Sequence, residues 1–117
     1  MTASLAPFLI MLKCYKLCKI LQKNYTEKHI SNQLIRASTS IGANYEEARG
    51  SESNADFAHK IGVTLKEARE TLYWLRIISE SELIQPKKLE NLIIETNEIC
   101  AILTTTAKTM KNKLAKT

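Results

Sequence analysis

The chain has 117 residues, of which 44% are hydrophobic and 25% are charged, and its formal net charge is +5. This length suits one ordinary domain and leaves no room for a second. With 3 Gly and 2 Pro, the composition excludes a turn-rich β-sandwich or barrel and predicts an all-α domain over residues 1–117.

Neither a membrane span nor a secretory signal is predicted. The apolar stretch at residues 8–12 is interrupted by Lys13, far short of the roughly 20 residues that a span needs. Residues 1–7 contain no charged side chain, whereas a secretory signal begins with a basic segment. We therefore expect a cytoplasmic protein, whose cysteines we interpret as buried thiols. They are Cys14, Cys18 and Cys100.

Breaker residues divide the chain into four blocks of similar length, each with apolar residues at helical spacing. We predict helices at about residues 4–24, 27–49, 54–80 and 86–114. Long helices joined by short loops pack as neighbours that run in opposite directions. The predicted fold is an antiparallel up-down-up-down four-helix bundle.

The first predicted helix is apolar around most of its circumference. One bundle cannot bury all of these side chains, so we expect this helix to contact a second subunit in a homo-oligomer. A frayed N-terminal segment is the alternative.

The remaining helices carry local signals of their own. The second has small residues near its middle, which would allow a close helix crossing. They are Ala37, Ser38, Gly42 and Ala43. The third begins with Ser53 three residues before Asp56, which resembles a capping box. The fourth starts at Pro86, a residue suited to a first helical turn.

Basic side chains gather at both ends of the chain, while all 12 Asp and Glu lie between residues 26 and 107. The terminal lysines are Lys13, Lys16, Lys19 and Lys23 near the start, and Lys108, Lys111, Lys113 and Lys116 near the end. A lysine row without acidic partners is a track for phosphates, because neutralised phosphates release counterions. The alternative is a solvated helix face that binds nothing.

Residue patterns of common enzyme sites are missing from the sequence. The glycines form neither a dinucleotide fingerprint nor a phosphate loop. Asp56 and His59 have the spacing of one di-iron ligand pair, but the usual Glu is replaced by Asp. Cys14 and Cys18 lack the second ligand pair of a zinc site. We therefore expect no catalytic residue, no metal and no cofactor.

Five stretches in the middle of the chain closely resemble one protein family. They are QLIRASTSIGAN at residues 33–44, EEA at 46–48, DF at 56–57, LKEARET at 65–71 and YWLR at 73–76. The family comprises four-helix bundle proteins encoded by intervening sequences inside 23S ribosomal RNA genes, and the resemblance covers about residues 8–110. It implies a ring-like homopentamer with suspected nucleic-acid association and a largely uncharacterised role. Similar accessory proteins of diversity-generating retroelements are pentamers that engage a reverse transcriptase and nucleic acid.

Seven residues of these stretches are expected to have mainly structural roles. They are Arg36, Ser40, Asn44, Phe57, Glu67, Glu70 and Trp74. We expect Arg36 to reach Glu67 or Glu70 on the next helix, and Asn44 to fix helix register through hydrogen bonds in the interior. The alternative is a ligand-binding cluster of Arg36, Asn44 and Glu67.

Together, the sequence favours a non-enzymatic oligomeric bundle that binds nucleic acid, with RNA preferred, through the terminal lysines. Lysine rows contact phosphates rather than bases, so weak sequence specificity is expected. The alternative is a protein-interaction scaffold or an accessory subunit, for example of a reverse transcriptase.

Overall fold

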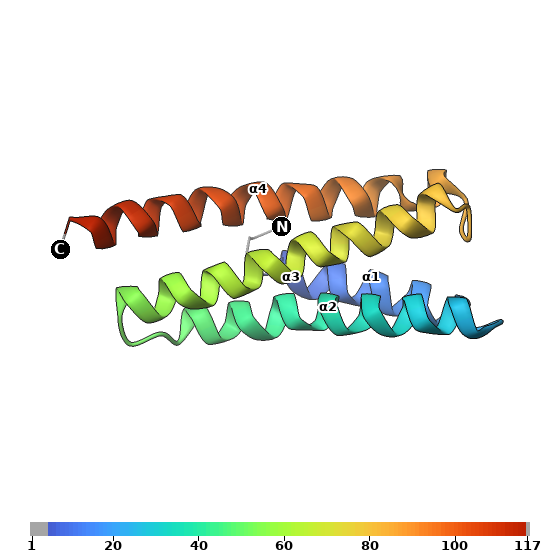
Figure 1. Ribbon diagram of the computed structural model, residues 1–117, viewed down its shortest axis with the longest axis horizontal. Coiled ribbons are helices and arrows are strands. Elements are labelled where there is room, and N and C mark those ends of the chain that lie inside the picture. The colour runs from blue at the N-terminus through green and yellow to red at the C-terminus, as the bar shows by residue number, and fades with distance from the viewer. Residues whose placement is uncertain (1–4, 117) are drawn as a thin grey trace.

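A computed structural model describes residues 5–116 as four α-helices joined by short turns (Figure 1). They are α1 (Ala6–Ile20), α2 (Tyr25–Arg49), α3 (Asn54–Glu80) and α4 (Pro86–Ala115). Successive helices run in opposite directions along a molecule that measures 52 × 23 × 21 Å. The predicted all-α, up-down-up-down four-helix bundle is confirmed.

Helix α1 ends earlier than the sequence predicted. The predicted start at residue 4 lies outside the described residues, and the helix ends at Ile20 rather than near residue 24. Leu21 leaves the helix and is buried, and its carbonyl oxygen accepts a 2.8 Å hydrogen bond from Ser31 Oγ of α2. Asn24 then caps α2, because its side chain accepts a 2.9 Å hydrogen bond from the Glu27 amide. Side-chain hydrogen bonds therefore stabilise the turn between α1 and α2, which the helical spacing of apolar residues did not predict.

The other helix ends agree closely with the sequence. Ser53 is the N-cap of α3, and its Oγ accepts a 3.0 Å hydrogen bond from the Asp56 amide, as the predicted cap requires. Gly50 follows the last residue of α2, and Pro86 occupies the first turn of α4.

The core runs along the inner sides of all four helices. Its largest fully buried apolar side chains are Ile10, Leu21, Leu34, Ile41, Ile61, Leu75, Ile78 and Leu89. All three cysteines are buried and unpaired, which confirms their prediction as buried thiols. Three threonine side chains are also fully buried, and each hydroxyl donates to the carbonyl four residues earlier in its own helix.

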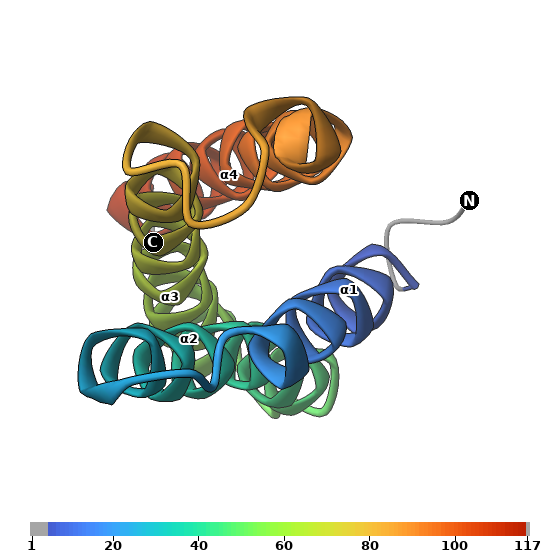
Figure 2. The ribbon, with the colours of Figure 1, turned by 90° about the vertical axis from the view of Figure 1, so that its right-hand side faces the viewer.

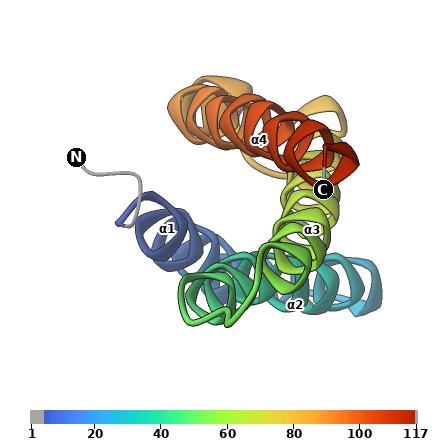
Figure 3. The same cartoon turned by 90° about the vertical axis from the view of Figure 1, so that its left-hand side faces the viewer.

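The four helices do not close evenly around this core. Helix α2 packs against α1 and α3, and α3 packs against α4, but α1 meets α4 only sparsely. End-on views place α1 and α4 at the two ends of an open arc (Figures 2 and 3). An apolar pocket of about 290 Å³ lies between the helices where α1 begins, with Pro7, Tyr45, Phe57 and Ile102 among its lining residues.

Apolar side chains of α1 remain on the surface, as the sequence predicted for a single bundle. Phe8 is 53% exposed, Tyr15 49% and Ile20 61%. Helices α2 and α4 therefore leave part of the apolar surface of α1 in contact with solvent. The contact of α1 with a second subunit stays a prediction. No helix within residues 5–116 is both long enough and apolar enough to cross a membrane.

The small residues of α2 do not all serve a close helix crossing. Ala37 and Ser38 are fully buried, but Ala43 is exposed and a Cβ atom added at Gly42 would meet nothing within 4 Å. Gly42 and Ala43 line a pocket with Phe8 and Met11 of α1, so they face this helix across a gap and do not make the close crossing that the sequence predicted.

Replacing Gly42 by alanine is expected to raise the free energy of unfolding by about 0.5–1 kcal/mol, because a glycine inside a helix loses more backbone entropy on folding. Urea unfolding followed by circular dichroism measures this change. Gly62→Ala is the matched variant, because a Cβ there also meets nothing within 4 Å. If Gly42→Ala lowered the free energy of unfolding while Gly62→Ala raised it, the open space that the structure shows beside Gly42 would be contradicted.

Candidate nucleic-acid interface

The N-terminal lysines begin on α1 and continue past its end. Lys13, Lys16 and Lys19 are exposed on the helix, whereas Lys23 is exposed in the turn before α2. Each residue of an α-helix rotates by about 100° around the axis, so two lysines that are three residues apart point in directions about 60° apart. The side chains therefore fan over about a third of the circumference of α1. The prediction of a row of four lysines on one helix is therefore wrong. Three of the lysines spread over one side of α1, and the fourth lies in the turn after it.

Lys13 differs from the others because it has an acidic partner. Its Nζ lies 2.8 Å from both carboxylate oxygens of Glu95 on α4. This ion pair links α1 to α4 across the side of the bundle where they meet sparsely. The prediction of a row without acidic partners is thus wrong at Lys13, because Glu95 is 82 residues away in the sequence.

Lys16, Lys19 and Lys23 form no ion pair with an acidic side chain of residues 5–116. The Nζ of Lys19 lies 5.7 Å from the centre of the Tyr15 ring, which stabilises the ammonium while leaving it at the surface. These three cations remain available to bind phosphate.

The C-terminal lysines lie at the other end of the molecule. Lys108, Lys111 and Lys113 are exposed on α4, and Lys116 follows its last residue. Figure 1 places this end of α4 far from the turn between α1 and α2, along the 52 Å axis. The eight predicted lysines therefore do not form one continuous surface on a single subunit.

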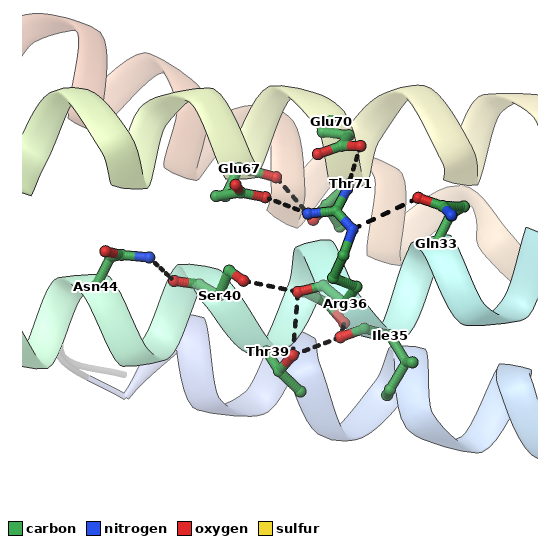
Figure 4. A network of polar contacts seen from close by, with 10 residues as sticks. Gln33, Ile35, Arg36, Thr39, Ser40, Asn44, Glu67, Glu70 and Thr71 are labelled. Carbon is green, nitrogen blue, oxygen red and sulfur yellow. Dashed lines mark hydrogen bonds and ion pairs between the residues drawn. The ribbon is translucent and has the colours of Figure 1, made fainter.

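Arg36 joins α2 to α3 as predicted (Figure 4). Its Nη1 lies 3.4 Å from Glu67 Oε2, its Nη2 donates to Glu70 Oε1, and its Nε donates to Gln33 Oε1 at 3.4 Å. The hydrogen bond from Arg36 lowers the pKa of Glu70 below its ordinary value. Arg36 therefore connects α2 to α3 through its ion pairs with Glu67 and Glu70, and the alternative of a ligand-binding cluster stays untested.

Ser40 and Asn44 form hydrogen bonds within α2 (Figure 4). Ser40 Oγ donates to the Arg36 carbonyl at 2.8 Å, and the Asn44 amide donates to the Ser40 carbonyl at 2.9 Å. Asn44 is half-buried. The prediction that Asn44 fixes register between helices is corrected, because its amide donates to its own helix.

Phe57 and Trp74, the remaining motif residues, both pack against the core from its edge. Phe57 also lines the apolar pocket near the start of α1. The indole Nε1 of Trp74 is buried without a hydrogen bond of ordinary geometry. Their packing against the core is observed, and their expected structural roles stay a prediction.

The histidines and cysteines do not assemble a chemical site. Within residues 5–116 no three His, Cys, Asp or Glu side chains are grouped as metal ligands. Burial raises the pKa of the Cys14 thiol to about 12, and burial also raises the pKa of Cys18 and of Cys100. Such thiols stay protonated near neutral pH and are poor nucleophiles.

A second basic face, on α3, was not predicted from the sequence. Lys66, Arg69 and Arg76 are exposed there, and the exposed ring of Tyr73 lies among them. Counting charges segment by segment does not reveal this face, because the segment that contains it, residues 26–107, is acidic overall. The signal that would have found it is the spacing of three, four and three residues on one helix.

Comparisons with known proteins agree with this architecture. A family model described as 23S rRNA-intervening sequence protein matches residues 8–105. A solved structure of a protein with unknown function from the S23 ribosomal protein family of Bacteroides thetaiotaomicron is 34% identical to this chain. The match covers 92% of this chain and 99% of that chain, with a TM-score of 0.83. A comparison with curated proteins found no match. Because the family model spans most of the bundle, the chain belongs to the 23S rRNA-intervening sequence protein family.

Proposed function

We propose that this protein is a non-enzymatic RNA-binding bundle that works in the cytoplasm without a cofactor. Lys16, Lys19 and Lys23 bind RNA phosphates, together with the lysines at the end of α4. The observation that carries the proposal is that the three N-terminal cations are exposed and form no ion pair within residues 5–116. Lys13 has a structural role instead, because it is held by Glu95.

The proposed working form is a homopentamer in which α1 contributes to the subunit contacts. Its support is the half-exposed apolar surface of α1, which includes Phe8, Tyr15 and Ile20. In a ring, each group of lysines recurs around the symmetry axis, so the fields of equivalent groups add. The summed field attracts an RNA backbone more strongly than the field of one subunit does.

The double variant Lys16→Ala/Lys19→Ala is expected to weaken binding to every RNA sequence, because lysines on a helix contact phosphates and not bases. For single-stranded RNA, the plot of log affinity against log salt should become shallower by about 0.7 for each phosphate that the variant no longer neutralises. The measurement is fluorescence anisotropy of labelled RNA at several salt concentrations.

Arg49→Ala/Lys60→Ala is the matched control, because it removes the same charge from two cations already paired with Glu46 and Glu47. Its salt dependence should stay close to that of the unchanged protein. Equally weakened binding in the two double variants would contradict a specific role for α1 and would indicate that only total charge matters.

A protein-interaction scaffold or accessory subunit is the second candidate. It is favoured by the same exposed apolar side chains of α1 and by the apolar pocket of about 290 Å³ near the start of that helix. A stoichiometric protein partner that copurifies at high salt, together with absent RNA binding, would favour this function over the first.

A further inference from the structure

One side of α3 carries three basic side chains and one aromatic side chain over about 15 Å of helix. We define the α3 stripe as Lys66, Arg69, Tyr73 and Arg76. All four residues are exposed, and Tyr73 is 58% exposed. Their spacing of three, four and three residues keeps them within about a quarter of the helix circumference. The α3 stripe is therefore a narrower row than the fan of lysines on α1.

The cations of the α3 stripe have no acidic partners within residues 5–116. Glu67 and Glu70, which lie between them in the sequence, are held by Arg36 of α2. The remaining acid on this stretch, Glu80, follows Arg76 by one turn and forms no ion pair with it. The three cations of the stripe therefore stay unpaired at the surface of the described chain, although Arg36 neutralises only one of the two acids beside them.

Two cations of the stripe, Arg69 and Arg76, lie toward α4. Burial raises the pKa of the Cys100 thiol of α4, and the charges of Arg69 and Arg76 partly oppose this rise. Both guanidinium groups therefore lie close enough to α4 to act on Cys100. Figure 2 shows α3 between α2 and α4. Glu67 and Glu70 reach Arg36 of α2, whereas Arg69 and Arg76 act on Cys100 of α4.

Tyr73 is held in place by other rings. Its ring meets Trp74 edge to face at 5.2 Å between centroids, and Trp74 meets His29 of α2 at 6.2 Å. His29 in turn stacks with Tyr25 at 6.3 Å. Because Trp74 packs against the core, Tyr73 is an exposed ring on a rigid support.

An exposed aromatic ring between unpaired cations is the arrangement that binds single-stranded nucleic acid. Every unpaired base can stack on an aromatic face, while lysine and arginine neutralise the flanking phosphates. A base inside a duplex is already stacked and cannot reach such a ring. This chemistry distinguishes the α3 stripe from the lysines of α1, which can contact single strands and duplexes alike.

We propose that the α3 stripe is a binding site for single-stranded RNA, in which Tyr73 stacks on an unpaired base and the three cations hold neighbouring phosphates. The site rests on the RNA-binding function proposed above but uses a surface separate from α1. It would give the protein a preference for unpaired regions of RNA.

The test compares an unstructured oligouridylate with an RNA duplex of the same length. Tyr73→Ala is expected to bind the oligouridylate about tenfold more weakly and the duplex with unchanged affinity. Tyr73→Phe keeps the ring and should bind both RNAs like the unchanged protein. Circular dichroism of each variant shows whether the bundle remains folded.

Trp74 supplies a second readout, because it is the only tryptophan of the chain and lies against Tyr73. Oligouridylate binding should change its fluorescence, and the change should be lost in Tyr73→Ala. Unchanged oligouridylate affinity in folded Tyr73→Ala, with weaker binding in Lys16→Ala/Lys19→Ala, would overturn the α3 site and leave the proposed function intact. Absence of RNA binding by the unchanged protein would overturn both.

Discussion

Replacing Leu34 by alanine is expected to lower the free energy of unfolding by about 2–5 kcal/mol. Leu34 is fully buried in the middle of α2, the helix that packs against both α1 and α3. Truncation removes apolar area from the core and leaves a cavity that three helices cannot fill without moving. Urea unfolding of the purified variant measures the decrease.

Ile94→Ala is the matched control, because it removes a similar apolar side chain from a position on α4 that is 50% exposed. We expect the decrease in the free energy of unfolding to be several times smaller than for Leu34→Ala, because half of the Ile94 side chain is already exposed to water in the folded state. A small effect at Leu34, or equal effects at the two positions, would contradict the packing of α2 at the centre of the bundle.

Raising the pH from 9 to 12 is expected to remove up to about 4 kcal/mol of stability through Cys14 alone. Burial raises the pKa of its thiol from 9.0 to about 12. Between these values the unfolded chain has lost the thiol proton and the folded chain has kept it. The folded state therefore binds more protons, and stability that is fully present below pH 9 falls as the pH rises.

The measurement is urea unfolding of the unchanged protein and of Cys14→Ala at a series of pH values from 8 to 11. All other ionisable groups are the same in both proteins, so the difference between the two slopes isolates Cys14. The free energy of unfolding of Cys14→Ala should fall less steeply with rising pH than that of the unchanged protein. Parallel curves would contradict the burial of a protonated thiol at this position.

Helical spacing and end signals were enough to predict most of the fold. Ser53 and Pro86 located the starts of α3 and α4, because capping depends on neighbours in the sequence. The end of α1 was placed too late, because apolar spacing continues through Leu21. What ends the helix is the burial of Leu21 and the hydrogen bond that its carbonyl accepts from Ser31, ten residues later.

The candidate site was predicted less completely, because ion pairs between helices depend on tertiary structure. The contact of Arg36 with the acids of α3 was foreseen from residue type and the expected crossing. The pair between Lys13 and Glu95 was not, because nothing in the sequence relates these two positions. The α3 stripe was missed for a different reason, because charge was counted by segment and the spacing of its residues on one helix was not considered. That Arg36 holds Glu67 and Glu70 could be seen only in the structure.

The most direct test of RNA binding is the salt dependence of affinity for a labelled structured RNA, with double-stranded DNA of equal length alongside. We expect log affinity to fall linearly with log salt, with a slope that corresponds to about six or more neutralised phosphates, at about 0.7–0.9 each. That number is twice the three unpaired N-terminal lysines of one subunit, so it requires either the C-terminal lysines or a second subunit as well. Absence of binding at low salt, or an affinity that salt does not change, would contradict the account.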